Sequence, residues 1–165
     1  MYKFRNVKTE DLDRITELEG RAFIPEVADT KEAFRERIEK ISDTFIVAED
    51  NNEVVGFING PIIKQPYITD DLFKKVPDTT NGEFLSVLGL VVAETHQGQG
   101  LAGLLLDRFT KRAEKLKTKS ITLTCIENLV PFYERYGFES HGPSRSQHGG
   151  EQWLNMVKSL DRREQ

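Results

Sequence analysis

The chain passes directly from an apolar strand candidate into an amphipathic helix in the stretch Val91-Val92-Ala93-Glu94-Thr95-His96-Gln97-Gly98-Gln99-Gly100-Leu101-Ala102-Gly103. Glycine has no Cβ, so Gly98 and Gly100 let the backbone turn tightly and approach a ligand closely. The first amides of a helix have no partners within it and lie at its positive pole, where phosphate oxygens bind well. No Gly-Lys-Ser/Thr follows, which argues against a Walker-type nucleotide loop. The segment from Gln97 to Gly103 is therefore predicted to bind a cofactor pyrophosphate.

A dinucleotide is one cofactor that fits this turn. The spacing Gly98-x-Gly100-x-x-Gly103 matches the dinucleotide fingerprint, and Glu127 ends the next strand near the place of a ribose-binding acid. Five residues separate Val92 from Gly98, however, whereas the fingerprint turn follows its strand almost directly. The motif also lies past mid-chain, which leaves too little sequence for further βαβ units. We keep a dinucleotide as the rival hypothesis.

The other elements of the chain follow from the periodicity of its apolar residues and from its turn signals. Leu12, Ile15 and Ala22 recur at helical spacing, and Asn51-Asn52 is a tight-turn signal between two β-rich runs. In chain order we expect a strand at 2–7 and a helix at 10–22, capped by Thr9 with Glu10 and Asp11 in its first turn. A second helix at 30–41 (capped by Asp29 with Glu32), a hairpin of strands at 44–48 and 54–58, and an irregular stretch from Pro61 to Gly82 follow. After them we expect one central strand at 84–92, a helix at 101–116, a strand at 121–125, a short helix capped by Asn128 and ended by Gly137, and final strands at Phe138 and at 153–157. This order predicts a mixed α/β fold in a single domain.

The bulk composition limits the function classes. A chain of 165 residues is about one domain long, and its net charge of -4 argues against a duplex nucleic-acid binder. No apolar run approaches a membrane span, and the start shows no apolar secretory segment. The lone Cys125 fits a reducing cytoplasm, where we expect the protein. His96, His141 and His148 are scattered, so no metal site is expected.

Two motifs carry a resemblance to a known family. The turn contains Gln97-x-x-Gly100-x-Ala102, and the segment Asn128-Leu129-Val130-Pro131-Phe132-Tyr133-Glu134-Arg135-Tyr136-Gly137-Phe138 has the form Asn-x-x-x-x-Tyr-x-x-x-Gly-Phe. In this order the chain resembles the GCN5-related N-acetyltransferase (GNAT) superfamily over residues 1–160, with 161–165 as a polar tail. The resemblance implies a central mixed, mostly antiparallel sheet flanked by helices. It also implies acetyl transfer from acetyl-CoA to a primary amine by direct attack in a ternary complex.

Two shorter segments favour a branch of that superfamily. Phe23-Ile24-Pro25-Glu26 and Ser146-Gln147-His148-Gly149-Gly150-Glu151-Gln152-Trp153 are similar to segments of bacterial arylalkylamine N-acetyltransferase-like proteins. This likeness implies a small aryl- or alkylamine or a polyamine as acceptor. A protein or peptide amine is the alternative, and a non-catalytic acyl-CoA-binding module is an alternative of another class. A homodimer is a further expectation, since such enzymes are often dimers.

The resemblance also implies roles for individual residues. Tyr133 is expected to protonate the leaving thiolate, while the base is assigned to Glu26, with Glu83 as runner-up. Arylalkylamine N-acetyltransferases of the vertebrate type carry two histidines on the strand before the turn, where this chain has Ser86 and Leu88. The residues expected to bind the cofactor are Leu90, Val91, Val92, Gln97, Gly98, Gln99, Gly100, Leu101, Ala102, Gly103 and Asn128, and those expected to bind the substrate are Phe23, Glu26, Ser86, Leu88 and His148.

Aromatic and acidic side chains are expected to gather around the acceptor. By position in the fold, the candidates for this cleft are Phe23, Glu26, Phe57, Tyr67, Asp70, Asp71 and Glu83. Aromatic rings with carboxylates suit a cationic amine that bears an apolar tail. The long stretch from Pro61 to Gly82 is either a lid over this cleft or a surface insertion.

Overall fold

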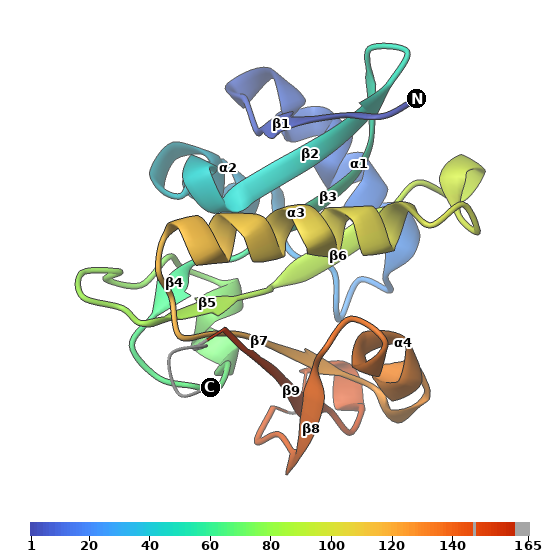
Figure 1. Ribbon diagram of the computed structural model, residues 1–165. Helices are drawn as coiled ribbons and strands as arrows, with labels where there is room; N and C mark the ends of the chain where they lie inside the picture. The colour runs from blue at the N-terminus through green and yellow to red at the C-terminus, as the bar shows by residue number, and fades with distance from the viewer. Residues whose placement is uncertain (147, 161–165) are drawn as a thin grey trace.

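Two sheets that diverge from each other form the frame of the molecule (Figure 1). A computed structural model describes residues 1–146 and 148–160. The first sheet is antiparallel, and its strands in spatial order are β1 (Lys3–Asn6), β2 (Phe45–Asp50), β3 (Glu53–Asn59) and β6 (Gly89–Val92). The strands of the second sheet in spatial order are β4 (Ile62–Ile63), β5 (Phe84–Ser86), β7 (Ser120–Cys125), β9 (Leu154–Ser159) and β8 (Glu139–Pro143). In this sheet β5 and β7 are parallel and the other pairs are antiparallel.

Helices cover both faces of the first sheet. They are α1 (Leu12–Ala22), α2 (Lys31–Lys40) and α3 (Leu101–Lys115), whereas the short α4 (Val130–Glu134) lies beside β8 of the second sheet (Figure 1). Gly56 of β3 faces Leu101 and Leu105 of α3, whereas its neighbour Phe57 packs edge-on against Phe34 of α2. Successive residues of a strand point to opposite faces, so α3 lies on one side of the sheet and α2 on the other (Figure 1). The single-domain mixed α/β fold predicted from the sequence is therefore confirmed.

Local signals located most of the elements correctly. The first two helices and the hairpin lie where the periodicity placed them, and Asn51 and Asn52 both have left-handed backbone, with φ of 52° and 65°. Asparagine tolerates this conformation better than most residues, which explains the tight turn. Gly137, with φ of 93°, follows α4 as expected.

The expected central strand at 84–92 is wrong, because the chain forms two strands there that belong to different sheets. The backbone N–H of Val87 donates to the carbonyl of Thr122 at 2.9 Å, and that of Leu88 donates to the carbonyl of Asn59 at 2.7 Å. At this point the chain leaves β7 and joins β3. The break lies inside a continuous apolar run, so side-chain periodicity carries no sign of it. As a result β6 is an edge strand of the first sheet, facing a wedge that opens toward β7.

Three predicted caps are also wrong. Thr9 lies in the 3-10 turn Thr9–Asp11, and Asp11 occupies the cap position of α1. Thr30, not Asp29, caps α2, and its hydroxyl accepts a hydrogen bond from the amide of Ala33 at 3.1 Å. Asn128 lies in a preceding 3-10 turn, and the cap position of α4 is occupied by Leu129. The carboxylate of Asp29 instead pairs with Arg37 of α2, with 2.9 Å between Oδ2 and Nη1.

Candidate active site

The turn before α3 is a backbone cradle. Gly98 and Gly100 have φ of 76° and 82°, a conformation that residues with a Cβ rarely adopt. A Cβ added at either position would meet nothing within 4 Å, so the space above the turn is open to a ligand. Gly100 is the N-cap of α3 and contributes no side chain to the first amides of the helix. Those amides are therefore available to an anion.

Side chains around the turn fix it to the first sheet. Gln97 donates from Nε2 to the carbonyl of Val92 at 3.2 Å, so this side chain ties the turn back to β6. Tyr2 donates its hydroxyl proton to Oε1 of Gln99 at 2.7 Å, and Nε2 of His96 lies 2.9 Å from a carboxylate oxygen of Asp50. These contacts hold the cradle before any ligand binds, which lowers the cost of ordering it.

An open groove of about 590 Å³ runs between the cradle and α4. A Cβ on Gly103 would lie 1.9 Å from the hydroxyl of Tyr136, so a larger residue there would force the Tyr136 ring to move away from α3. Arg135 of the segment after α4 brings a guanidinium to the groove wall. The described residues lining the groove are Val92, His96, Gln97, Gly98, Gly100, Leu101, Ala102, Gly103, Phe132, Arg135 and Tyr136. Open amides together with a guanidinium fit a pyrophosphate.

Gly100→Ala is expected to weaken binding of CoA about tenfold. A left-handed conformation costs an L-residue roughly 1–2 kcal/mol, so the turn relaxes away from the geometry that presents its amides. Titration calorimetry with CoA measures the change. Gly20→Ala is the control, because Gly20 lies in α1 with open space around it and an ordinary helical backbone. An equal affinity for the Gly100 variant and the wild type would contradict a role for this turn.

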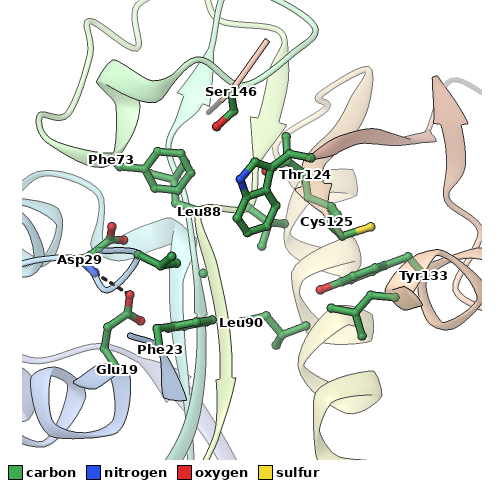
Figure 2. A pocket seen from close by; sticks show the side chains of 16 residues that line it. Glu19, Phe23, Asp29, Phe73, Leu88, Leu90, Thr124, Cys125, Tyr133 and Ser146 are labelled. Atoms are coloured by element: carbon green, nitrogen blue, oxygen red, sulfur yellow. Dashed lines mark hydrogen bonds between the residues drawn. The ribbon is translucent and has the colours of Figure 1, made fainter. Parts of the chain in front are cut away.

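A second cavity, of about 150 Å³, lies in the wedge between the two sheets (Figure 2). Its described lining residues are Glu19, Phe23, Val27, Asp29, Phe73, Val87, Leu88, Gly89, Leu90, Leu123, Thr124, Cys125, Leu129, Tyr133, Ser146 and Trp153. Most of these side chains are apolar or aromatic. The edge of β6, through Gly89 and Leu90, borders the same space, and an edge strand offers backbone groups that an extended ligand can pair with.

Tyr133 points into this cavity from α4 (Figure 2). Its ring is held edge-on by Phe132 and Phe138, with ring centroids 5.0 and 5.8 Å away. Burial raises the pKa of the Tyr133 phenol above its ordinary value, and the neighbouring thiol of Cys125 adds to the effect. Burial likewise raises the pKa of Cys125 to about 11. Both groups therefore keep their protons at neutral pH, so Tyr133 is a proton donor and Cys125 is not a thiolate nucleophile.

Two carboxylates on the opposite side of the cavity were not expected from the sequence. The side chain of Glu19, on α1, is 4% exposed, and its Oε2 accepts a hydrogen bond from the backbone N–H of Asp29 at 2.8 Å. The other oxygen, Oε1, has no hydrogen-bond partner among the described residues. Burial, helped by the charge of Asp29, raises the pKa of Glu19 to about 8, even though the Asp29 amide and the charge of Arg37 both act to lower it.

Arg37 holds this acidic pair in place. It is 1% exposed, and its Nη1 lies 2.9 Å from Oδ2 of Asp29 and donates to Oδ1 of Asn59 at 3.1 Å. Its Nη2 donates to the carbonyl of Phe73 at 2.9 Å. The sequence contained one signal for this cluster, since Glu19 and Arg37 each interrupt the apolar stripe of a helix. Charged residues at such positions are rarely buried without a partner.

Part of the predicted site comes together in the two cavities. Phe23, Leu88, Leu90 and Tyr133 line the inner cavity. Val92, Gln97, Gly98, Gly100, Leu101, Ala102 and Gly103 line the groove. Val91 and Gln99 lie beside these residues in the chain, outside both linings, with Val91 in the core.

The two glutamates predicted as base lie outside the cavity lining. Glu26 is exposed in the connection between α1 and α2, and Glu83 is exposed and pairs with Lys119 at 3.0 Å. Ser86 is buried and donates its hydroxyl proton to the carbonyl of Pro61 at 2.7 Å. Asn128 is exposed and lines neither cavity. The backbone of residue 148 lies in the 3-10 turn His148–Gly150, and the side chain of this histidine is outside the described part of the structure.

The remaining cleft candidates are dispersed. Phe57 is a fully buried core residue, and Tyr67 shares a hydrogen bond with Nδ1 of His141 at 2.8 Å. Asp70 accepts a hydrogen bond from the hydroxyl of Ser146 at 2.6 Å. The stretch from Pro61 to Gly82 packs its own small cluster of Ile63, Ile68 and Leu72 against Leu88. Through Phe73, this stretch forms one wall of the inner cavity.

Other classes of site find no support in residues 1–146 and 148–160. No group of histidine, cysteine and acidic side chains there could hold a metal ion. No helix in the same ranges is long and apolar enough to span a bilayer.

Comparison with known proteins assigns the family. The protein-family model of the acetyltransferase (GNAT) domain matches residues 9–160. A search of curated protein sequences found no match to the chain. The fold is similar to the loading GNATL domain of CurA from Lyngbya majuscula, with a TM-score of 0.81, 16% identity, and coverage of 96% of this chain and 98% of that one. It is similar to the ribosomal-protein-S18-alanine N-acetyltransferase of Escherichia coli (TM-score 0.69, 18% identity, 98% and 95% coverage). It is also similar to the diaminobutyrate acetyltransferase EctA of Paenibacillus lautus, solved with its substrate and coenzyme A (TM-score 0.71, 17% identity, 98% and 97% coverage).

Proposed function

Because the chain belongs to the GNAT acetyltransferase family and is thus an acyl-CoA-dependent N-acetyltransferase, we propose that its acceptor is a small primary amine with an apolar aryl or alkyl group. The observation that carries this proposal is the lining of the inner cavity. Apolar and aromatic walls surround two carboxylates, and none of the described lining residues is a lysine, arginine or histidine. Such a cavity suits one cationic group on an apolar body.

The size and charge of the cavity narrow the acceptor further. An engineered apolar cavity of about 150 Å³ in another protein binds benzene. The cavity here has about the same volume, so a single ring or a short alkyl chain fits. Asp29 is already paired with Arg37, which leaves Glu19 as the acid that can compensate the charge of an acceptor. A polyamine or a basic peptide would bring further charges into an apolar space, which is costly.

The residues of the chain fit acetyl-CoA, which supplies the acetyl group as an activated thioester. The amides of the turn from Gln97 to Gly103 and the guanidinium of Arg135 would bind the pyrophosphate. The edge of β6 from Leu90 to Val92 would orient the extended arm and polarise the acetyl carbonyl. Tyr133 would donate its phenolic proton to the departing sulfur, since its raised pKa keeps that proton in place at neutral pH.

A thiol-release assay with acetyl-CoA and a panel of amines tests this proposal. We expect phenylethylamine and hexylamine to be acetylated with kcat/KM at least about tenfold above spermidine, lysine and an alanine-ended peptide, because a buried unpaired charge costs more than 1.4 kcal/mol. Preference for the peptide would support the protein-amine alternative instead. Turnover of no amine would favour a non-catalytic acyl-CoA-binding module.

Thermal stabilisation separates acetyl-CoA from the dinucleotide rival. A ligand that binds only the folded state raises the melting temperature. We expect a rise with acetyl-CoA and none with NADH at the same concentration. Stabilisation by NADH alone would contradict the assignment of the turn.

A further inference from the structure

We propose that Glu19 accepts the proton of the acceptor ammonium before the amine attacks the acetyl group. This inference rests on the proposed function. It assigns the general base to a residue that lines the cavity. Glu26 and Glu83, the two bases predicted from the sequence, both lie outside the cavity lining.

The geometry around Glu19 differs from that of a structural carboxylate. One oxygen is fixed by the amide of Asp29 at 2.8 Å, which sets the orientation of the group. The second oxygen is buried, has no described hydrogen-bond partner, and belongs to a side chain that lines the cavity. A buried acceptor without a partner costs free energy, and an ammonium bound in the cavity would satisfy it. Figure 2 shows Glu19 and Tyr133 on opposite sides of the cavity, one placed to take a proton and the other to give one.

Among the described residues, the charged groups that act on Glu19 are Asp29 and Arg37. Asp29 lies in the connection before α2, and Arg37 lies on α2 itself. From the far side of the cavity, β7 brings the thiol of Cys125 and α4 brings the phenol of Tyr133, both protonated at neutral pH. On β3 the nearby polar side chain of the cluster is the neutral Asn59. Asp29 and Arg37 largely offset each other, so ionised Glu19 gives the cluster one net negative charge, matched to one ammonium.

The proton balance of the step is complete without another reactant. An N–H bond of the ammonium breaks, its proton passes to Oε1 of Glu19, and the electron pair stays on nitrogen. The new C–N bond forms at the acetyl carbon while the C–S bond breaks, and Tyr133 gives its proton to sulfur. A second proton leaves the nitrogen and restores the phenol. Glu19 returns its proton to solvent after the product departs.

Burial makes Glu19 a better base than an exposed glutamate. Its pKa of about 8 compares with 4.5 for the free side chain. Proton transfer from an alkylammonium of pKa about 10 is then unfavourable by about 10²-fold, rather than about 3 × 10⁵-fold for an unshifted carboxylate. Above pH 8 the side chain is mostly ionised and able to accept the proton.

The test is the pH profile of kcat/KM for phenylethylamine in the full-length wild type and in Glu19→Gln. The wild-type value is expected to rise up to pH about 8 and then level off. At pH 8, the kcat/KM of Glu19→Gln is expected to be about 10²-fold lower than that of the wild type, because a general base usually contributes at least this factor. Above pH 8, its kcat/KM is expected to continue rising toward the pKa of the amine. Asp29→Asn removes a charge that raises the pKa of Glu19, so its profile is expected to rise at lower pH than that of the wild type.

A second measurement needs no substrate. The folded state holds the Glu19 proton up to pH about 8, whereas the unfolded chain releases it near 4.5. The unfolded state therefore binds fewer protons across this window, and the stability of the wild type should fall as pH rises through it. In urea unfolding, Glu19→Gln is expected to lack this fall and to be the more stable protein at pH 9. Equal pH dependence of the two proteins would overturn the placement of a neutral, buried Glu19.

Matched variants separate this inference from the proposed function. Glu17→Gln is the control, because Glu17 lies on the same helix but is exposed and paired with Arg14 and Arg21 at 2.9 and 3.0 Å. If the wild type acetylates the amine and Glu19→Gln keeps the wild-type profile, the role of Glu19 is wrong and the function stands. Loss of the pH-dependent rise in Glu26→Gln or Glu83→Gln, with Glu19→Gln unaffected, would return the base to the exposed glutamates. If the wild type acetylates no amine, both proposals fail together.

Discussion

Tyr133→Phe is expected to lower kcat for amine acetylation about 10²- to 10³-fold while changing the Kd for acetyl-CoA less than about twofold. A positioned general acid contributes about 10²–10⁴ to a rate, and the substitution removes only the hydroxyl that supplies the proton. The ring stays packed between Phe132 and Phe138, so the cavity keeps its shape. Thiol release measures kcat, and calorimetry measures the affinity.

The melting temperature of the Tyr133 variant is the internal control. We expect it to match that of the wild type within a few degrees, because no packing atom other than the oxygen is lost. Retention of the full kcat would contradict the assignment of Tyr133 as acid. Loss of acetyl-CoA affinity together with rate would show that the hydroxyl binds rather than reacts.

Arg37→Leu is expected to lower the free energy of unfolding by about 3–5 kcal/mol, as breaking a buried ion pair commonly does. The guanidinium is the cation paired with buried Asp29, and it also bonds Asn59 and the carbonyl of Phe73. Its loss removes the guanidinium beside the Asp29 carboxylate and the hydrogen-bond donors to Asn59 and to the carbonyl of Phe73. Urea unfolding at pH 8, where Glu19 is about half ionised, measures the effect.

Two further variants make the Arg37 prediction specific. Arg35→Leu, on the exposed side of the same helix, is expected to change stability by less than about 0.5 kcal/mol. The double variant Arg37→Leu with Asp29→Asn should recover part of the loss, because it removes the buried charge that Arg37 compensates. A loss below about 1 kcal/mol for Arg37→Leu alone would show that water reaches this cluster and screens it.

Elements set by local sequence were predicted well. The Asn51-Asn52 turn depends on the tolerance of asparagine for left-handed backbone, and the first two helices depend on apolar periodicity, so both could be read from neighbouring residues. The turn at Gly98 and Gly100 follows the same rule, since a position that needs positive φ selects glycine in the sequence itself. The family assignment came from such local motifs and is confirmed.

The inner cavity could not be predicted in the same way. It exists because the run 84–92 changes sheets at Val87 and Leu88, and this change is made by hydrogen bonds to Thr122 and Asn59, which lie far away in the chain. Backbone bonds of this kind are available to every residue except proline as donor, so they impose no residue type that a pattern could reveal. The prediction of one strand followed from its apolar composition alone.

The sequence by itself determined the glycine turn before α3, and the tertiary structure decided the buried acid cluster and the cavity beside it. The turn that we propose to bind the pyrophosphate is one short segment whose glycines are required by their own backbone angles. The acid cluster joins Glu19, Asp29 and Arg37 from two helices and their connection, and its chemistry depends on burial. Burial raises the pKa of Glu19 to about 8, while the exposed Glu26 remains outside the cavity. Exclusion of water is a property of the packed fold, so the place of Glu19 in the apolar stripe of α1 indicated burial but not the cavity that its carboxylate lines.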